Sequence, residues 1–161
     1  MEMNVSNNLE KETLAFQERF MSHVPSDSKD ISLAILKGHL LAEEILADYI
    51  SIKIKHSEHL RLEKNHWGFA NKVELASALA SDKHHDVWVW NALKKLNSLR
   101  NKLSHGLEPK GLDNAISEFK KAVKPYSPSQ YKGEEVTIYG YVLFTVSGLF
   151  VVVKAEEGLI A

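Results

Sequence analysis

Residues 31–54 read ISLAILKGHLLAEEILADYISIKI and form the longest helix candidate in the chain. Apolar residues in this stretch recur at spacings of three, four, seven and three, which places them on one face of an α-helix. They are Leu33, Leu36, Leu40, Ala47 and Ile50, and the stripe is widened by Ile35, Leu41, Ile45, Leu46 and Tyr49. A helix this apolar is expected to be buried between several neighbours. The stretch therefore predicts a bundle of helices.

Helical patterns continue on both sides of this stretch, separated by short polar breaks. Asp30 is placed to cap the long helix, and Gly106 is placed to end a later one in a left-handed conformation. The other predicted helices are 9–24, 69–80, 86–105 and 112–123, with 56–66 as a loop. The pattern predicts one all-α domain over residues 1–161, a bundle of five or six helices, with residues 1–8 as a flexible segment.

The segment 136–153 allows three interpretations. Its 18 residues carry no charge, which approaches the length of a membrane span. Its valines favour a strand. No second strand-like segment exists to pair with it, and a lone strand leaves its backbone groups unsatisfied. We therefore expect a core helix, with a strand or a membrane-associated segment as the alternatives.

The composition excludes several classes of protein. The 161 residues are 44% apolar and 25% charged, as in a soluble globular domain. The chain has no cysteine, so disulfides, cysteine nucleophiles and thiolate metal sites are excluded. The formal net charge of −1 argues against a nucleic-acid binder that is basic over its whole surface. The first residues are polar and acidic, unlike a signal peptide, so we expect a cytoplasmic protein.

Residues 96–106, LNSLRNKLSHG, carry the most informative polar group. Asn101 and His105 are four residues apart and share one face of the predicted helix. Arg100 points about 140° away from His105, but its long side chain can reach the same side. As an alternative, these cations interact favourably with a helix C-terminus, and Asn101 bonds a neighbouring helix.

The run Arg100-Asn101-Lys102-Leu103-Ser104-His105 resembles the Arg-Asn-x-x-x-His signature of HEPN domains. The segment 38–46, GHLLAEEIL, is similar to the second helix of a HEPN-like subgroup that includes mannitol-operon-repressor-type proteins. The segment 69–76, FANKVELA, is similar to its third helix. The three blocks occur in the expected order and cover residues 31–109.

This resemblance implies a homodimer in which the motif helices of two subunits face each other across a cleft. In catalytic members that cleft cuts RNA without a metal or cofactor. His105 would then act as general base or acid, since an imidazole titrates near neutral pH. Arg100 would fork onto the phosphoryl oxygens, and Asn101 would orient the His or the phosphate. Residues expected to support the site or contact RNA are Ser104, Lys102, Asn97, Lys72, Glu44 and His39, with Lys94 and Lys95 on flanking phosphates.

Several of these residues have a structural alternative. His39 and Glu43 are four residues apart, and we expect them to join helices more than to line a cleft. Lys72 is expected to be solvated or paired. Trp88 and Trp90 are expected in core or dimer packing. Histidines 56, 59, 66, 84 and 85 lack the companions of a metal motif, so no metal site is expected.

Two functions compete with the ribonuclease. One is a non-catalytic regulator of the mannitol-operon-repressor type, which acts through protein contacts. The other is a structural or membrane-associated module. An endoribonuclease could be a toxin or defence effector with a cognate antitoxin. Leu107 stands where many HEPN toxins have a modified Tyr, so regulation through that Tyr is not implied.

Overall fold

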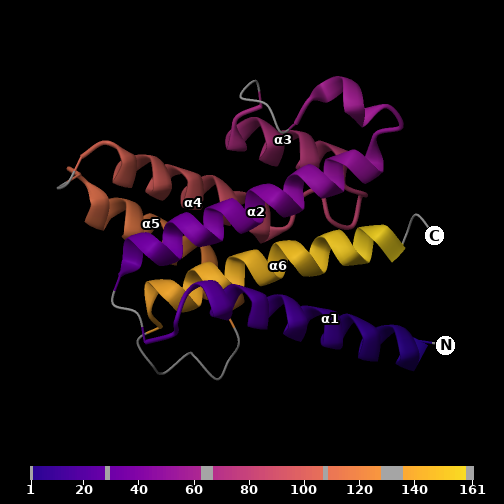
Figure 1. Ribbon diagram of the computed structural model, residues 1–161, viewed down its shortest axis with the longest axis horizontal. Helices are drawn as coiled ribbons and strands as arrows, with labels where there is room; N and C mark the ends of the chain where they lie inside the picture. The colour runs from indigo at the N-terminus through magenta and orange to yellow at the C-terminus, as the bar shows by residue number, and fades with distance from the viewer. Residues whose placement is uncertain (1, 28–29, 63–66, 107–108, 128–135, 159–161) are drawn as a thin grey trace.

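The computed structural model describes residues 2–27, 30–62, 67–106, 109–127 and 136–158, without the side chains of residues 2–7. Within these ranges the chain forms six α-helices and no strand (Figure 1). The helices are α1 (Glu2–His23), α2 (Ile31–Lys53), α3 (Phe69–Leu79), α4 (Trp88–Ser104), α5 (Leu112–Val123) and α6 (Ile138–Gly158), with the short 3₁₀ helices η1 (Ser57–Leu60) and η2 (Lys124–Tyr126). The predicted all-α bundle is confirmed.

Helices α2 and α6 form the centre of the bundle. Helix α2 packs against α3, α4 and α6, and α6 also contacts α1, α4 and α5. In Figure 1, α6 lies between α2 and α1. Gly38 of α2 allows the close approach to α6, because a Cβ at this position would overlap Cγ1 of Val142. The expected burial of α2 between several neighbours is confirmed.

The uncharged segment 136–153 belongs to helix α6, as expected. Among the described helices, α6 alone is long and apolar enough to cross a membrane by length and composition. In this fold it is a core helix, since Val142, Val146 and Leu149 are fully buried. Burial against several neighbours explains its apolar composition without a membrane.

Helix boundaries follow local chemistry. Oδ1 of Asp30 accepts hydrogen bonds from the backbone N–H groups of Ser32 (2.9 Å) and Leu33 (3.1 Å), so the predicted cap of α2 is confirmed. Gly106 follows the C-cap of α4 with φ of +151°, a value that favours glycine. Helix α1 begins at Glu2, earlier than the predicted residue 9. The flexibility of residues 1–8 stays a prediction.

The predicted buried face of α2 is partly wrong. Leu36 and Leu40 were expected in its buried stripe, but they are 42% and 59% exposed. Ile35, Leu46 and Tyr49, which were expected to widen the stripe, are fully buried. Because apolar residues occur almost all around α2, its periodicity could not show which side its neighbours cover. The exposed leucines lie beside the predicted functional residues.

Candidate functional site

The last turns of α4 carry an exposed polar stripe. Lys94, Ser98, Asn101 and His105 are exposed and recur at spacings of four, three and four. This spacing places them on one face of the helix. Arg100 is half-buried and lies about 140° around the helix from His105, on the side of Asn97, which is hydrogen-bonded to His39 of α2.

Two of the motif residues contact each other near the end of α4. Nη1 of Arg100 donates a hydrogen bond to Oδ1 of Asn101 at 3.2 Å, which brings the guanidinium toward the stripe. Oγ of Ser104 donates to the backbone oxygen of Asn101 at 2.8 Å. Among the residues described, the imidazole of His105 has no hydrogen-bond or ion-pair partner. An unoccupied imidazole and a cation are therefore available to solvent in one turn.

Beneath this turn, His39 links α2 to α4. Its Nε2 is hydrogen-bonded to Oδ1 of Asn97 at 3.1 Å, and its ring stacks on Phe69 with 4.0 Å between centroids. The side chain is buried. Burial lowers the pKa of His39, and the positive charges of Arg100 and Lys72 act in the same direction against the bond to Asn97. His39 is thus a neutral helix-joining group at neutral pH.

Lys72 and Glu43 form a second link, between α3 and α2. Nζ of Lys72 donates to Oε1 of Glu43 at 2.8 Å, and the lysine is only 4% exposed. His39 and Glu43 were expected to join helices, and both do so, but with different partners. His39 bonds Asn97 of α4, and Glu43 bonds Lys72 of α3. Lys72 is a paired lysine, and its charge is neutralised within the fold.

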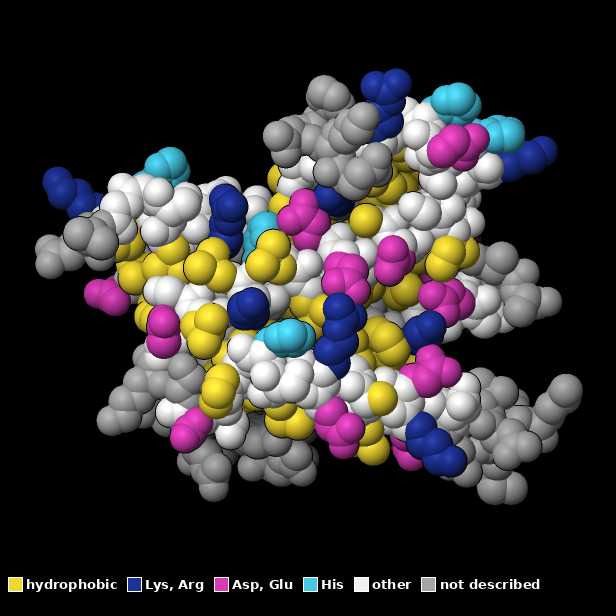
Figure 2. Space-filling view, viewed as in Figure 1, with side chains coloured by type: hydrophobic (Ala, Val, Ile, Leu, Met, Phe, Trp, Pro, Cys, Tyr) yellow, Lys and Arg dark blue, Asp and Glu magenta, His cyan; other side chains and the backbone are white. Residues whose placement is uncertain are grey.

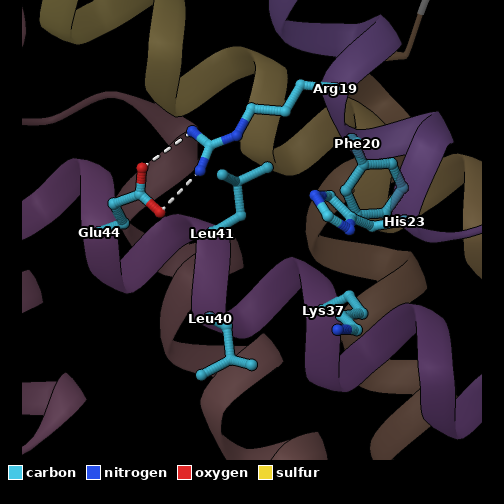
Figure 3. Close-up of a pocket in the computed structure, with 7 residues that line it drawn as sticks. All are labelled: Arg19, Phe20, His23, Lys37, Leu40, Leu41 and Glu44. Carbon is cyan, nitrogen blue, oxygen red and sulfur yellow. Dashed lines mark hydrogen bonds and ion pairs between the residues drawn. The ribbon is translucent and has the colours of Figure 1, made fainter.

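The structure does not bring Glu44 to the motif. Its carboxylate accepts two hydrogen bonds from Arg19 of α1, at 2.8 and 3.0 Å (Figure 3). The bond to Arg19 lowers the pKa of Glu44. Glu44 and His39 are five residues apart and point about 140° from each other around α2. Glu44 thus lines a shallow groove between α1 and α2 together with Leu40.

Lys102 lies where α4 meets the start of α5. Its Nζ donates to the backbone oxygen of Lys110 at 3.3 Å, and the residue is exposed. Its amino group keeps further donors for a phosphate. Of the predicted supporting residues, Ser104, Asn97 and Lys102 share α4 with the motif, His39 packs beneath it, and Lys72 and Glu44 are committed to other partners.

Two exposed leucines of α2 lie between His39 and the α1–α2 groove, and Leu40 also lines that groove (Figure 3). Leu36 and Leu40 lie on α2 between His39 on one side and Glu44 on the other. Figure 2 shows the face on which α2 lies in front, where hydrophobic side chains are interspersed with charged ones.

A second polar cluster was not predicted. Glu156 of α6 is fully buried, and its carboxylate accepts hydrogen bonds from Lys53 Nζ (2.6 Å), Ser81 Oγ (2.5 Å), the Ser81 backbone (3.1 Å), His84 Nδ1 (2.6 Å) and Tyr49 (3.3 Å). Burial raises the pKa of this carboxyl, but the bonds from Lys53, Ser81 and His84 outweigh it and lower the pKa to about 2.

This cluster has the residue types of a hydrolase triad without its geometry. A triad needs the imidazole between the nucleophile and the acid. Here Oγ of Ser81 and Nδ1 of His84 both bond the same oxygen of Glu156. The cluster therefore ties α6 to α2 and to the α3–α4 connection. The only sequence signal was a carboxylate that continues an apolar helix.

The remaining sequence candidates are structural. Trp88 stacks between Phe144 and Tyr126, and Nε1 of Trp90 donates to the backbone oxygen of His84 at 2.7 Å, so their expected role in packing is confirmed for the core. Within the described ranges, no three His, Cys, Asp or Glu side chains are grouped as metal ligands. His66 and Leu107 lie outside the described residues.

Comparison with protein-family models, curated proteins and solved structures gives no match to this chain. The similarity to HEPN domains therefore rests on the three sequence blocks. The all-α fold is established by the six helices that the described residues form.

Proposed function

We propose that the protein is a metal-independent endoribonuclease of the HEPN type. The observation that carries this proposal is the end of α4, where the cation of Arg100 and the imidazole of His105, which has no partner among the described residues, are both available to a ligand. These two groups suit a reaction in which RNA supplies its own nucleophile, the 2′-hydroxyl. The protein then needs only a proton acceptor and a cation for the phosphate.

The reaction follows from these roles. His105 takes the proton of the 2′-hydroxyl, and the 2′-oxygen bonds to the adjacent phosphorus. The bond from phosphorus to the 5′-oxygen breaks, and that oxygen takes up a proton. Arg100 stabilises the charge that develops on the phosphoryl oxygens, and Asn101 holds its guanidinium. The products carry a 2′,3′-cyclic phosphate and a 5′-hydroxyl.

A homodimer through the motif helix is part of the proposal. Leu36 and Leu40 are exposed on α2, the helix that His39 joins to α4, and a second copy would remove them from water. Two copies would also line one cleft with two motifs. In the cell we expect a cytoplasmic toxin or defence effector, controlled by an antitoxin or regulatory protein.

The test is RNA cleavage by the purified protein in EDTA. The parent should produce cyclic-phosphate ends. Arg100→Ala and His105→Ala should each lower the rate by about a hundredfold or more. His59→Ala is a matched control, because His59 is an exposed histidine of η1 and should leave the rate unchanged. Absence of cleavage by a folded, dimeric parent contradicts the proposal.

A second candidate is a non-catalytic regulator of the mannitol-operon-repressor type. The exposed Leu36 and Leu40 favour it, because an apolar strip on a helix suits a protein partner. A regulator should still bind its protein partner after His105→Ala and should lose that binding after Leu40→Asp. The nuclease should show the reverse for His105.

A further inference from the structure

Three aromatic rings form a column at one end of the α4–α5 pair. Phe144 of α6 stacks on Trp88 of α4 with 5.1 Å between centroids and 7° between planes. Trp88 stacks on Tyr126 of η2 with 5.3 Å and 11°. The rings are nearly parallel, so the column presents a flat aromatic end.

Tyr126 is the outermost ring of this column and is 53% exposed. A buried aromatic ring stabilises the core through the area that it removes from water. A ring as exposed as Tyr126 removes only part of its area from water and therefore contributes less. One face of the ring is occupied by Trp88. The column is thus able to continue with a further flat ring from outside.

The segment of the chain that ends at Tyr126 is basic. Residues 119–127 contain three lysines (Lys120, Lys121 and Lys124) and no acidic residue. Lys121 and Lys124 are exposed. Glu118, just before this segment, is paired with Lys121 and Lys95. The net charge of the whole chain, −1, hides this local excess of positive charge.

The α4–α5 seam connects this end to the motif. Trp88 contacts Tyr126 at one end, Lys95 contacts Glu118 at 3.5 Å in the middle, and Lys102 contacts the backbone of Lys110 at the other end. Helix α4 has 17 residues, so the seam runs for about 25 Å. Its far end lies one helical turn from His105.

We propose that Tyr126 is a stacking platform for a base of single-stranded RNA, and that the strand follows the α4–α5 seam to the motif. An exposed ring bordered by cations is what single strands bind: the base stacks on the ring and the lysines contact phosphates. Stacking of a base on Tyr126 does not depend on the proposed nuclease activity. Only the delivery of the bound strand to His105 rests on the proposed function.

Binding is measured by fluorescence anisotropy with a labelled 2′-O-methyl oligouridylate of roughly ten nucleotides, which lacks the attacking hydroxyl and stays intact. Tyr126→Ala should weaken binding about tenfold or more, and Tyr126→Phe should bind like the parent because it keeps the ring. Lys121→Ala with Lys124→Ala should reduce the salt dependence. Binding that changes less than about twofold in a folded Tyr126→Ala variant overturns the platform.

Photocrosslinking places the base independently of any effect on folding. An oligonucleotide with 5-iodouridine should crosslink to Tyr126 in the parent protein. Crosslinks confined to other residues, or no binding to RNA at all, overturn the proposal.

A dinucleotide substrate separates the platform from the nuclease. It is too short to span the seam, so Tyr126→Ala should cut it like the parent. Tyr126-dependent binding without cleavage of any RNA would uphold the platform and contradict the nuclease. Cleavage without an effect of Tyr126 on the longer strand would do the opposite.

Discussion

The two polar clusters of this molecule differ in how completely their groups are partnered. Glu156 is fully buried and accepts bonds from Tyr49, Lys53, Ser81 and His84. The motif turn at the end of α4 is exposed, and within the described part of the chain the imidazole of His105 has no partner.

This difference separates stability from binding. A buried carboxylate without partners would be strongly unfavourable, so the fold must supply every bond around Glu156. Those bonds leave no group for a ligand. The motif turn keeps its donors and acceptors in solvent, where they contribute little to stability and are available to a substrate.

The largest expected effect is the loss of Glu156. Glu156→Ala removes the anion that neutralises the nearby Lys53, whose side chain is 16% exposed. Breaking a buried ion pair from one side costs about 3–5 kcal/mol. For a chain of this size the melting temperature should fall by roughly 10 °C or more. Thermal unfolding followed by circular dichroism measures it.

Glu118→Ala is the matched control for this experiment. Glu118 also accepts bonds from two lysines, but it lies at the surface between Lys95 and Lys121. Its loss should leave the melting temperature nearly unchanged. An equal loss for both variants would show that burial is not the cause.

Acid should weaken the protein through the same carboxylate. The bonds from Lys53, Ser81 and His84 hold the pKa of Glu156 at about 2, below its ordinary value of 4.5. Because the folded pKa is depressed, its contribution is complete above pH 4.5 and is lost as the pH falls toward about 2. Urea unfolding across this window should show a steeper loss for the parent than for Glu156→Gln. Parallel curves would contradict the assignment.

The helices were predictable where a physical argument ruled out the alternatives to a helix. Helix α6 could be assigned because residues 136–153 had no strand to pair with. The exposed face of α2 could not, since apolar residues surround the helix. Leu36 and Leu40 became exposed because α3, α4 and α6 pack on its other side.

The two polar clusters also differed in predictability. Arg100, Asn101 and His105 lie within six residues, so the last turn and a half of one helix is enough to place them at the same end of α4. The partners of Glu156 come from α2 and the α3–α4 connection, and only the tertiary fold joins them. For the same reason the spacing of His39 and Glu43 suggested a mutual contact, while the fold gave them Asn97 and Lys72.

A smaller pH effect should come from His39. Burial lowers its pKa, so the unfolded chain binds its proton more readily than the folded one. Its contribution is therefore complete above the ordinary value of 6.5 and declines as the pH falls below it. The free energy of unfolding of the parent should decrease from about pH 7.5 to about 5.5 more than that of His39→Gln. An equal slope in the two proteins would mean that the fold does not lower the pKa of His39.

The smallest expected effect on stability is that of His105→Ala. The side chain is exposed and has no partner in the described residues, so the free energy of unfolding should change by about 0.5 kcal/mol or less. Chemical denaturation of the parent and the variant at neutral pH measures it. The same variant should lose RNA cleavage. His105→Ala should therefore abolish activity with almost no loss of stability, whereas Glu156→Ala should cause a large loss of stability. A loss of stability above about 1 kcal/mol would place His105 among the structural groups and remove the distinction between the clusters.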